Sequence, residues 1–302
     1  EAFGKRYNHG LWIAAETENG KTNMALDSDG NNFTLKNGGN FGIYGKWKVR
    51  NDDGLLIPPN SRPVITIEGA STKPANEADL PRFELYFMDS SSVTGGSSLL
   101  DIDTKTDTDV KKPIIKVNGY CIVYLVASEE TLFSCNPGAN ALEVSPNATV
   151  RFERGLGKFT VNGAVQNNGI LEIDRENGAL IFGGPITNQG ELKVLQKRDL
   201  TSTGTILNTG SIIFGEGGRM NGSGDFANEG SGELLLAKNS FLSAGNFTNN
   251  GKTSIPESAT VTTGTFDNIG ELSVGGSTEG TVPGNLTVGG DMMINSEKFQ
   301  IG

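Results

Sequence analysis

The chain has 302 residues, 42 of them glycine, and carries a formal net charge of −10 at pH 7. Nucleic acids and anionic membranes require a basic surface, so this charge argues against both as partners. The longest apolar run, from Cys121 to Ala127, is too short for membrane insertion, which needs about 18 or more apolar residues. High glycine content with few charged residues is typical of many short strands joined by turns.

Residues 1 to 30 are polar and mixed, and we expect them to form a cap or extension that covers the first strand edge. Asp27, Asp29 and Asn31 place oxygen ligands at alternate positions, as calcium loops do. The downstream glutamate of an EF-hand is missing, so a solvated turn is the favoured interpretation and a calcium site the alternative. His9 is the only histidine, which leaves a serine or cysteine triad without a plausible general base.

Residues 31 to 140 contain strand-like segments without a fixed period. We interpret them as irregular β-helix turns interrupted by loops at 51 to 63, 70 to 81 and 90 to 112, which are rich in Pro, Ser, Thr, Asp and Gly. Irregular loops on a regular scaffold are common contact sites, so these loops are the predicted ligand-binding regions. A separate β-sandwich domain is the alternative for this part of the chain.

Acidic residues are concentrated in and just before the third loop, at Asp89, Asp101, Asp103, Asp107 and Asp109. A glycosidase needs only two carboxylates, so Asp89, Asp101 and Asp103 are the candidate catalytic residues if the chain is an enzyme. Carboxylates two residues apart would share one face of a strand and repel unless a cation or sugar hydroxyls lay between them. A solvated loop is the favoured interpretation, and an enzyme is the less favoured function.

Cys121 and Cys135 are the only cysteines. Each lies at an end of a short region with two apolar runs, so the pair could form a disulfide in an oxidising compartment. Two buried free thiols are the alternative, and the sequence does not decide between them.

Residues 141 to 302 are organised by a repeated tripeptide, Asn-x-Gly. The six glycines are separated by 21, 20, 20, 21 and 19 residues, and the asparagines are Asn167, Asn188, Asn208, Asn228, Asn249 and Asn268. A short run such as Glu191-Leu192-Lys193-Val194 follows each glycine, and its alternation of apolar and polar residues has the period of a strand. A fixed period near 20 residues with strand periodicity predicts an all-β parallel β-helix solenoid, in which each turn buries its apolar face against its neighbours.

The recurrence of Asn and Gly has a physical basis at a repeated corner. Glycine adopts positive φ without steric cost, and asparagine tolerates the left-handed region. Stacked asparagine side chains can also form a ladder of amide hydrogen bonds along the solenoid. The alternatives, a structural ladder and plain turn residues, are both open from the sequence.

This pattern resembles the right-handed parallel β-helix proteins, which include pectin-lyase-like enzymes, phage tailspikes and bacterial adhesin or autotransporter passenger domains. The resemblance covers residues 140 to 302 well and residues 30 to 140 loosely, and the adhesin passengers are closest in style. It implies a secreted or cell-surface adhesin or structural rod that binds a host or surface glycan or protein. A polysaccharide-degrading enzyme or tailspike-like protein is one alternative, and a self-assembling surface-layer or filament subunit is another.

The chain contains five Asn-x-Ser/Thr sequons, which begin at Asn32, Asn147, Asn221, Asn246 and Asn285. Such sites accept glycans in a host with the required transferase. Several matches also arise by chance in a repeat rich in Asn and Thr, so the sequence alone gives them no weight.

Overall fold

The structure is a computed structural model that describes residues 10–14, 33–36, 39–44, 46–50, 65–88, 97–103, 115–127, 130–135, 140–153, 158–176, 178–275, 283–295 and 299–301. It confirms the predicted parallel β-solenoid. The chain divides into two compact units: an N-terminal unit of Glu1–Val165 with Arg175–Ala179, and a C-terminal unit of Gln166–Asp174 with Leu180–Gly302. The division falls within strand β14 (Ala164–Asn167). The boundaries predicted at residues 30 and 140 stay predictions.

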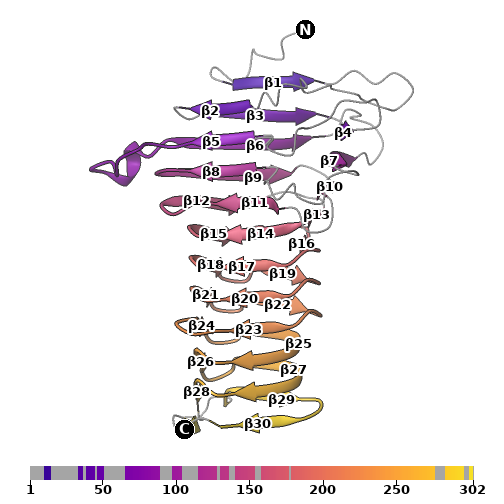
Figure 1. Cartoon of the computed structure of the whole chain (residues 1–302). Coiled ribbons are helices and arrows are strands. Elements are labelled where there is room, and N and C mark those ends of the chain that lie inside the picture. The colour runs from indigo at the N-terminus through magenta and orange to yellow at the C-terminus, as the bar shows by residue number, and fades with distance from the viewer. Residues whose placement is uncertain are drawn as a thin grey trace. The chain divides into compact units, whose positions relative to one another are not determined.

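The N-terminal unit contains three columns of strands, each strand pairing in parallel with its counterpart one turn later (Figure 1). The first column comprises β1 (Gly10–Ala14), β3 (Gly39–Tyr44), β6 (Arg82–Met88), β9 (Cys121–Ala127) and β12 (Ala148–Phe152). The second comprises β2 (Phe33–Lys36), β5 (Ile65–Glu68), β8 (Ile115–Asn118) and β11 (Asn140–Val144). The third comprises β4 (Lys46–Arg50), β7 (Ser97–Asp103), β10 (Glu130–Cys135) and β13 (Phe159–Asn162).

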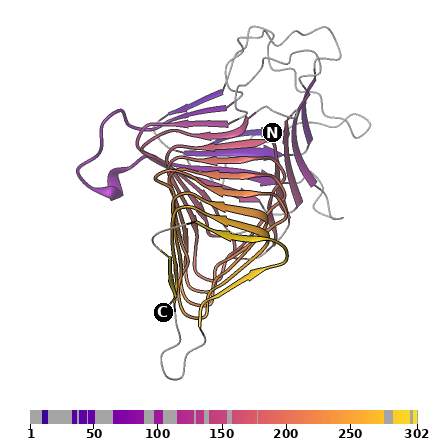
Figure 2. The same ribbon diagram turned by 60° about the horizontal axis from the view of Figure 1, so that its bottom comes forward.

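The C-terminal unit also has three columns, and Figure 2 shows its strands superposed turn upon turn. The first column comprises β15 (Ile170–Ile173), β18 (Glu191–Val194), β21 (Ser211–Phe214), β24 (Glu233–Leu235), β26 (Lys252–Ile255), β28 (Glu271–Val274) and β31 (Phe299–Ile301). The second comprises β16 (Leu180–Phe182), β19 (Asp199–Ser202), β22 (Arg219–Gly222) and β29 (Asn285–Val288). The third comprises β17 (Ile186–Asn188), β20 (Ile206–Asn208), β23 (Phe226–Asn228) and β30 (Met292–Ile294). The longer strands β25 (Phe241–Asn249) and β27 (Thr260–Asn268) each span the second and third columns.

The two units differ in the regularity of their turns. In the C-terminal unit the register partners Ile170, Glu191, Ser211, Glu233, Lys252 and Glu271 lie 21, 20, 22, 19 and 19 residues apart. In the N-terminal unit Gly39 and Phe83 are partners 44 residues apart, whereas Cys121 and Ala148 are 27 apart. The long turns contain the inserted segments, which explains why the sequence shows no fixed period there.

Alternating residues of each strand fill the interior of the C-terminal unit. Leu192 and Ile212 occupy the same register position in consecutive turns, and both are 0% exposed. Phe226, Phe247 and Phe266 form an inner stack with ring centroids 5.0 and 5.1 Å apart. Burial of apolar side chains contributes about 25 cal/mol per Å², so this stacking is the main source of stability.

An amide ladder runs from turn to turn through the interior beside this apolar stack. In each pair of neighbours, Nδ2 of one asparagine donates to Oδ1 of the next at 2.5 to 2.8 Å, and the members are Asn167, Asn188, Asn208, Asn228, Asn249 and Asn268. All six are 0% exposed. Their main chains also take part, because the carbonyl oxygen of Asn188 accepts from the N–H groups of Thr209 and Gly210 at 2.9 and 3.1 Å. The tripeptide therefore joins adjacent turns through both side chain and backbone.

The repeated glycine has a different role from the one that the sequence predicted. The prediction that glycine recurs because the corner needs positive φ is wrong for Gly190, Gly210 and Gly270, since none of them has positive φ. A Cβ atom on Gly210 would instead overlap the carbonyl oxygen of Gly190 one turn earlier. Glycine is needed because the two backbones approach closely. Gly230 is the exception, with φ of 56° and open space around it.

Candidate functional site

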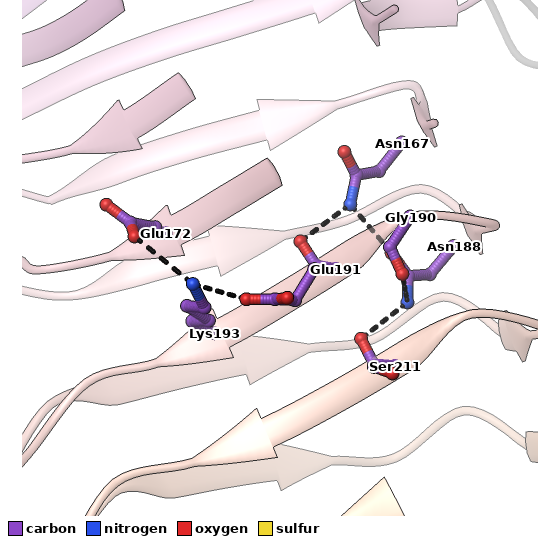
Figure 3. Close-up of polar contacts among 7 residues, drawn as sticks. All are labelled: Asn167, Glu172, Asn188, Gly190, Glu191, Lys193 and Ser211. Atoms are coloured by element: carbon purple, nitrogen blue, oxygen red, sulfur yellow. Dashed lines mark hydrogen bonds and ion pairs between the residues drawn. The ribbon is translucent and has the colours of Figure 1, made fainter. Parts of the chain in front are cut away.

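Charged side chains line the outer face of the first strand column in the C-terminal unit. Lys193 Nζ lies 3.7 Å from Glu172 Oε1 and also contacts the Glu191 carboxylate (Figure 3). Two and three turns further along the chain, Glu233 and Lys252 form a similar pair, with Lys252 Nζ 3.9 Å from Glu233 Oε1. Exposed ion pairs contribute only about 0 to 1 kcal/mol each, so they add little to folding. These side chains offer donors and acceptors to a polar partner.

The ladder supports this outer row directly. The backbone carbonyl of Glu191 accepts a hydrogen bond from Asn167 Nδ2 at 3.0 Å, while its carboxylate contacts Lys193 outside (Figure 3). Asn188 Nδ2 makes the equivalent bond to the carbonyl of Ser211 at 2.9 Å. Because the main chain at the start of each outer strand is fixed from inside, the outer side chains recur at a constant register.

A second exposed feature is the segment of residues 71–80, which projects from the strands between β5 and β6 in both views (Figures 1 and 2). Its base is fixed by two hydrogen bonds between the main chains of Ala70 and Tyr120, at 3.0 and 2.9 Å. At its tip, a 3₁₀ turn (Glu77–Asp79) is joined to Asn76, whose Nδ2 donates to Asp79 Oδ2 at 3.1 Å. This is the one predicted contact loop that the structure describes throughout, since it describes only residues 97–103 of the loop at 90 to 112 and none of the loop at 51 to 63.

The predicted catalytic carboxylates are placed only in part. Asp101 and Asp103 belong to strand β7, so the predicted loop at 90 to 112 is wrong for Ser97–Asp103. In the parallel register Asp101 is the partner of Lys48, and Asp103 is the partner of Arg50. Leu100 and Ile102 alternate with these acidic residues, which is a strand period that the polar composition of the surrounding segment obscured. Each acidic position therefore has a basic residue as its register partner on the neighbouring strand.

Several other predicted site residues lie outside the described residues. These are Asp27, Asp29 and Asn31 of the calcium candidate, Asp89 of the catalytic candidate, and the loop at 51 to 63. Within the described ranges, no group of three or more His, Cys, Asp or Glu side chains is arranged to hold a metal ion. The same ranges contain no helix with the length and apolar character of a membrane span.

Cys121 is a free thiol in this structure and is 1% exposed. Its Sγ lies 3.7 Å from the carbonyl oxygen of Asn118, within reach of a weak hydrogen bond. Burial raises the pKa of the Cys121 thiol to about 12, so the group is unreactive at neutral pH. The side chain of Cys135 lies outside the described residues, and the disulfide stays a prediction.

Arg175 is a buried charged residue that no sequence pattern indicated. It is 3% exposed, its Nη1 donates to the carbonyl oxygen of Glu153 at 3.4 Å, and its Cζ lies 6.0 Å from the centre of the Phe159 ring. Burial lowers the pKa of the guanidinium to about 10, which still leaves it charged at pH 7. Asp174 and Glu176 flank it in the sequence, so the segment has the composition of a solvated turn.

The strand columns, the packed interior and the amide ladder define the protein as a parallel β-solenoid. Comparisons with protein-family models, with curated proteins and with solved structures found no match. The functional argument is therefore made from the outer surface of this chain.

Proposed function

We propose that the protein is a secreted or cell-surface β-solenoid adhesin, which uses its outer surface to bind a glycan or protein on another surface. The observation that carries this proposal is the packed interior of the C-terminal unit, where apolar side chains and the asparagine ladder fill successive turns. A ligand of such a unit must bind outside it. The half-buried charged row around Lys193 in the C-terminal unit and the exposed 71–80 segment in the N-terminal unit supply polar groups at the surface.

The proposal is tested by a glycan-array screen run beside a reducing-end release assay on the same polysaccharides. Binding without release of reducing ends is the expected result for an adhesin. Release would contradict it and identify a polysaccharide-degrading enzyme, in which case Asp101→Asn and Asp103→Asn would be the first variants to assay. A result of neither binding nor release for any polysaccharide would leave a structural role.

The 71–80 segment provides a test at residue resolution. We expect replacement of Glu77 and Asp79 by Ala to weaken binding of any array ligand that contacts this segment, without a change in thermal unfolding, because both residues are exposed. A matched variant, Lys193→Ala, examines the charged row of the C-terminal unit. Unchanged affinity in both variants would exclude these two surfaces as the ligand site.

A further inference from the structure

Sequons in this chain begin only at exposed asparagines wherever the structure describes them. Asn147, Asn221, Asn246 and Asn285 are all exposed, while Asn32 lies outside the described residues. The six ladder asparagines are fully buried, and none of them begins a sequon. The asparagines thus fall into an inner set with a structural role and an outer set with accessible amides.

Strand geometry turns both functional groups of the outer sequons toward solvent. In Asn246-Phe247-Thr248, Phe247 is 1% exposed and points inward, so the residues on either side of it point outward. The same alternation applies to Asn285-Leu286-Thr287, where Thr287 Oγ1 donates to Asn285 Oδ1 at 3.4 Å. A period of two thus keeps the asparagine amide and the hydroxyl group of one sequon together on the outer face.

Three of these sequons also share one side of the C-terminal unit. Asn221 on β22 is the register partner of Ser243 on β25, and Ser243 is the partner of Thr262 on β27. Asn285 on β29 is the partner of Thr260 on β27. The sequons therefore follow the second strand column and its bend into the third. The described strands of the first column, which carry the charged row, contain no sequon.

We infer that Asn221, Asn246 and Asn285 are N-glycan acceptors that cover this side of the C-terminal unit, and that Asn147 is a fourth acceptor at a turn of the N-terminal unit. The inference rests on the proposed secreted or cell-surface location, because N-glycans are added in a secretory pathway. The donor is a lipid-linked oligosaccharide diphosphate. Nδ2 of the asparagine forms a bond to the anomeric carbon and loses one proton, while the bond from that carbon to the diphosphate oxygen breaks.

The local contacts are compatible with the modification. Asn147 has φ of 71° in the turn between β11 and β12, a conformation that asparagine tolerates, and the residue is exposed. Asn246 Nδ2 donates to Asp225 Oδ1 at 2.8 Å. A glycosylated amide keeps one N–H group, so this bond can persist. Glycans at these positions require no change in the packed interior.

The test is secretion of the full chain from a eukaryotic host, followed by peptide N-glycosidase treatment and site mapping by mass spectrometry. We expect several glycoforms that differ in the number of attached glycans. Enzyme treatment should convert them to one species, with conversion of Asn to Asp at residues 147, 221, 246 and 285. Asn221→Gln, Asn246→Gln and Asn285→Gln should each reduce the number of attached glycans by one. Thr248→Ala and Thr287→Ala should prevent glycan attachment at Asn246 and Asn285 while keeping the asparagines.

A positive control comes from the charged row. Glu271→Asn creates a sequon with Ser273 on the outer face of the first strand column and reports whether the host modifies this protein on a strand. Modification at residue 271 without modification at 221, 246 and 285 would overturn the inference. Circular dichroism before and after deglycosylation shows whether each variant is folded. Glycan transfer is measured without a ligand, so a negative glycan array would contradict glycan binding by the proposed adhesin and leave this result intact.

Discussion

At the scale of single residues, the ladder depends on the chemistry of the asparagine amide. A buried polar group costs free energy unless its hydrogen bonds are satisfied. Asn208 meets this requirement, because its Oδ1 accepts from Asn188 and its Nδ2 donates to Asn228 Oδ1 and to the carbonyl oxygen of Glu233. A hydroxyl group could not make the two donor contacts, and an apolar side chain could make none of them.

Replacement of Asn208 by Ala should lower the free energy of unfolding by about 2 to 4 kcal/mol, because it leaves a donor on Asn188 and acceptors on Asn228 and Glu233 without their partners. The matched control is Asn221→Ala, at an exposed position, with an expected change within about 0.5 kcal/mol. Urea unfolding followed by circular dichroism measures both values. Equal stability of the two variants would show that the ladder contributes nothing to folding.

Cys121 should make stability depend on pH in the alkaline range. Its folded pKa of about 12 exceeds the ordinary value of 9.0, so the unfolded chain releases the thiol proton first. The stabilisation is fully present below pH 9 and is lost as pH rises from 9 toward 12. Relative to Cys121→Ala, the wild-type protein should lose about 1 kcal/mol between pH 7 and pH 10. An unfolding difference that is constant over this range would contradict the assignment.

At the scale of strands and turns, the regular elements were predictable because their period is visible in the sequence. Glu191-Leu192-Lys193-Val194 alternates, and its strand β18 has the expected bounds. Strand β7 was missed because Asp and Ser dominate its segment, although Leu100 and Ile102 retain the alternation. The role of glycine was also missed, since sequence does not reveal the distance between two backbones in adjacent turns.

That distance leads to a prediction for Gly210. We expect Gly210→Ala to lower the free energy of unfolding by about 3 kcal/mol or more, because the new Cβ would overlap the carbonyl oxygen of Gly190 and the turn cannot move alone. Gly230→Ala is the matched variant, with open space but φ of 56°, and should cost about 1 kcal/mol. Thermal unfolding distinguishes them. The reverse order would mean that backbone conformation, rather than close approach, selects glycine in this tripeptide.

At the scale of the whole molecule, each turn of the C-terminal unit contacts only the turns before and after it. Deletion of residues 191–210 removes one turn and joins Gly190 to Ser211, which is the register partner of Glu191. We expect this variant to fold with the β-sheet circular dichroism spectrum of the parent and slightly lower stability. Deletion of residues 191–200 is the control, and it should prevent folding of the unit because it breaks both the strand register and the ladder.

The location of a ligand site was less predictable than the fold. Repeats report the packing of turns, because the same apolar and amide contacts recur in each one. The proposed contact surfaces use positions that differ between turns, such as the 71–80 segment or the ion pair of Lys193 with Glu172. The pairing of Asp101 and Asp103 with Lys48 and Arg50 joins residues more than 50 positions apart, and no local pattern indicated it.

The asparagine ladder has a direction as well as a length. Every amide in it points its oxygen toward the preceding turn and its nitrogen toward the next, so the amide dipoles add rather than cancel. The ladder therefore carries partial negative charge at Asn167, whose Oδ1 has no hydrogen-bond partner among the described residues, and partial positive charge at Asn268. The dipole of the ladder resembles the macrodipole of an α-helix, although side chains rather than the backbone produce it. The C-terminal unit thus has an electrically polar axis that its surface charges alone would not reveal.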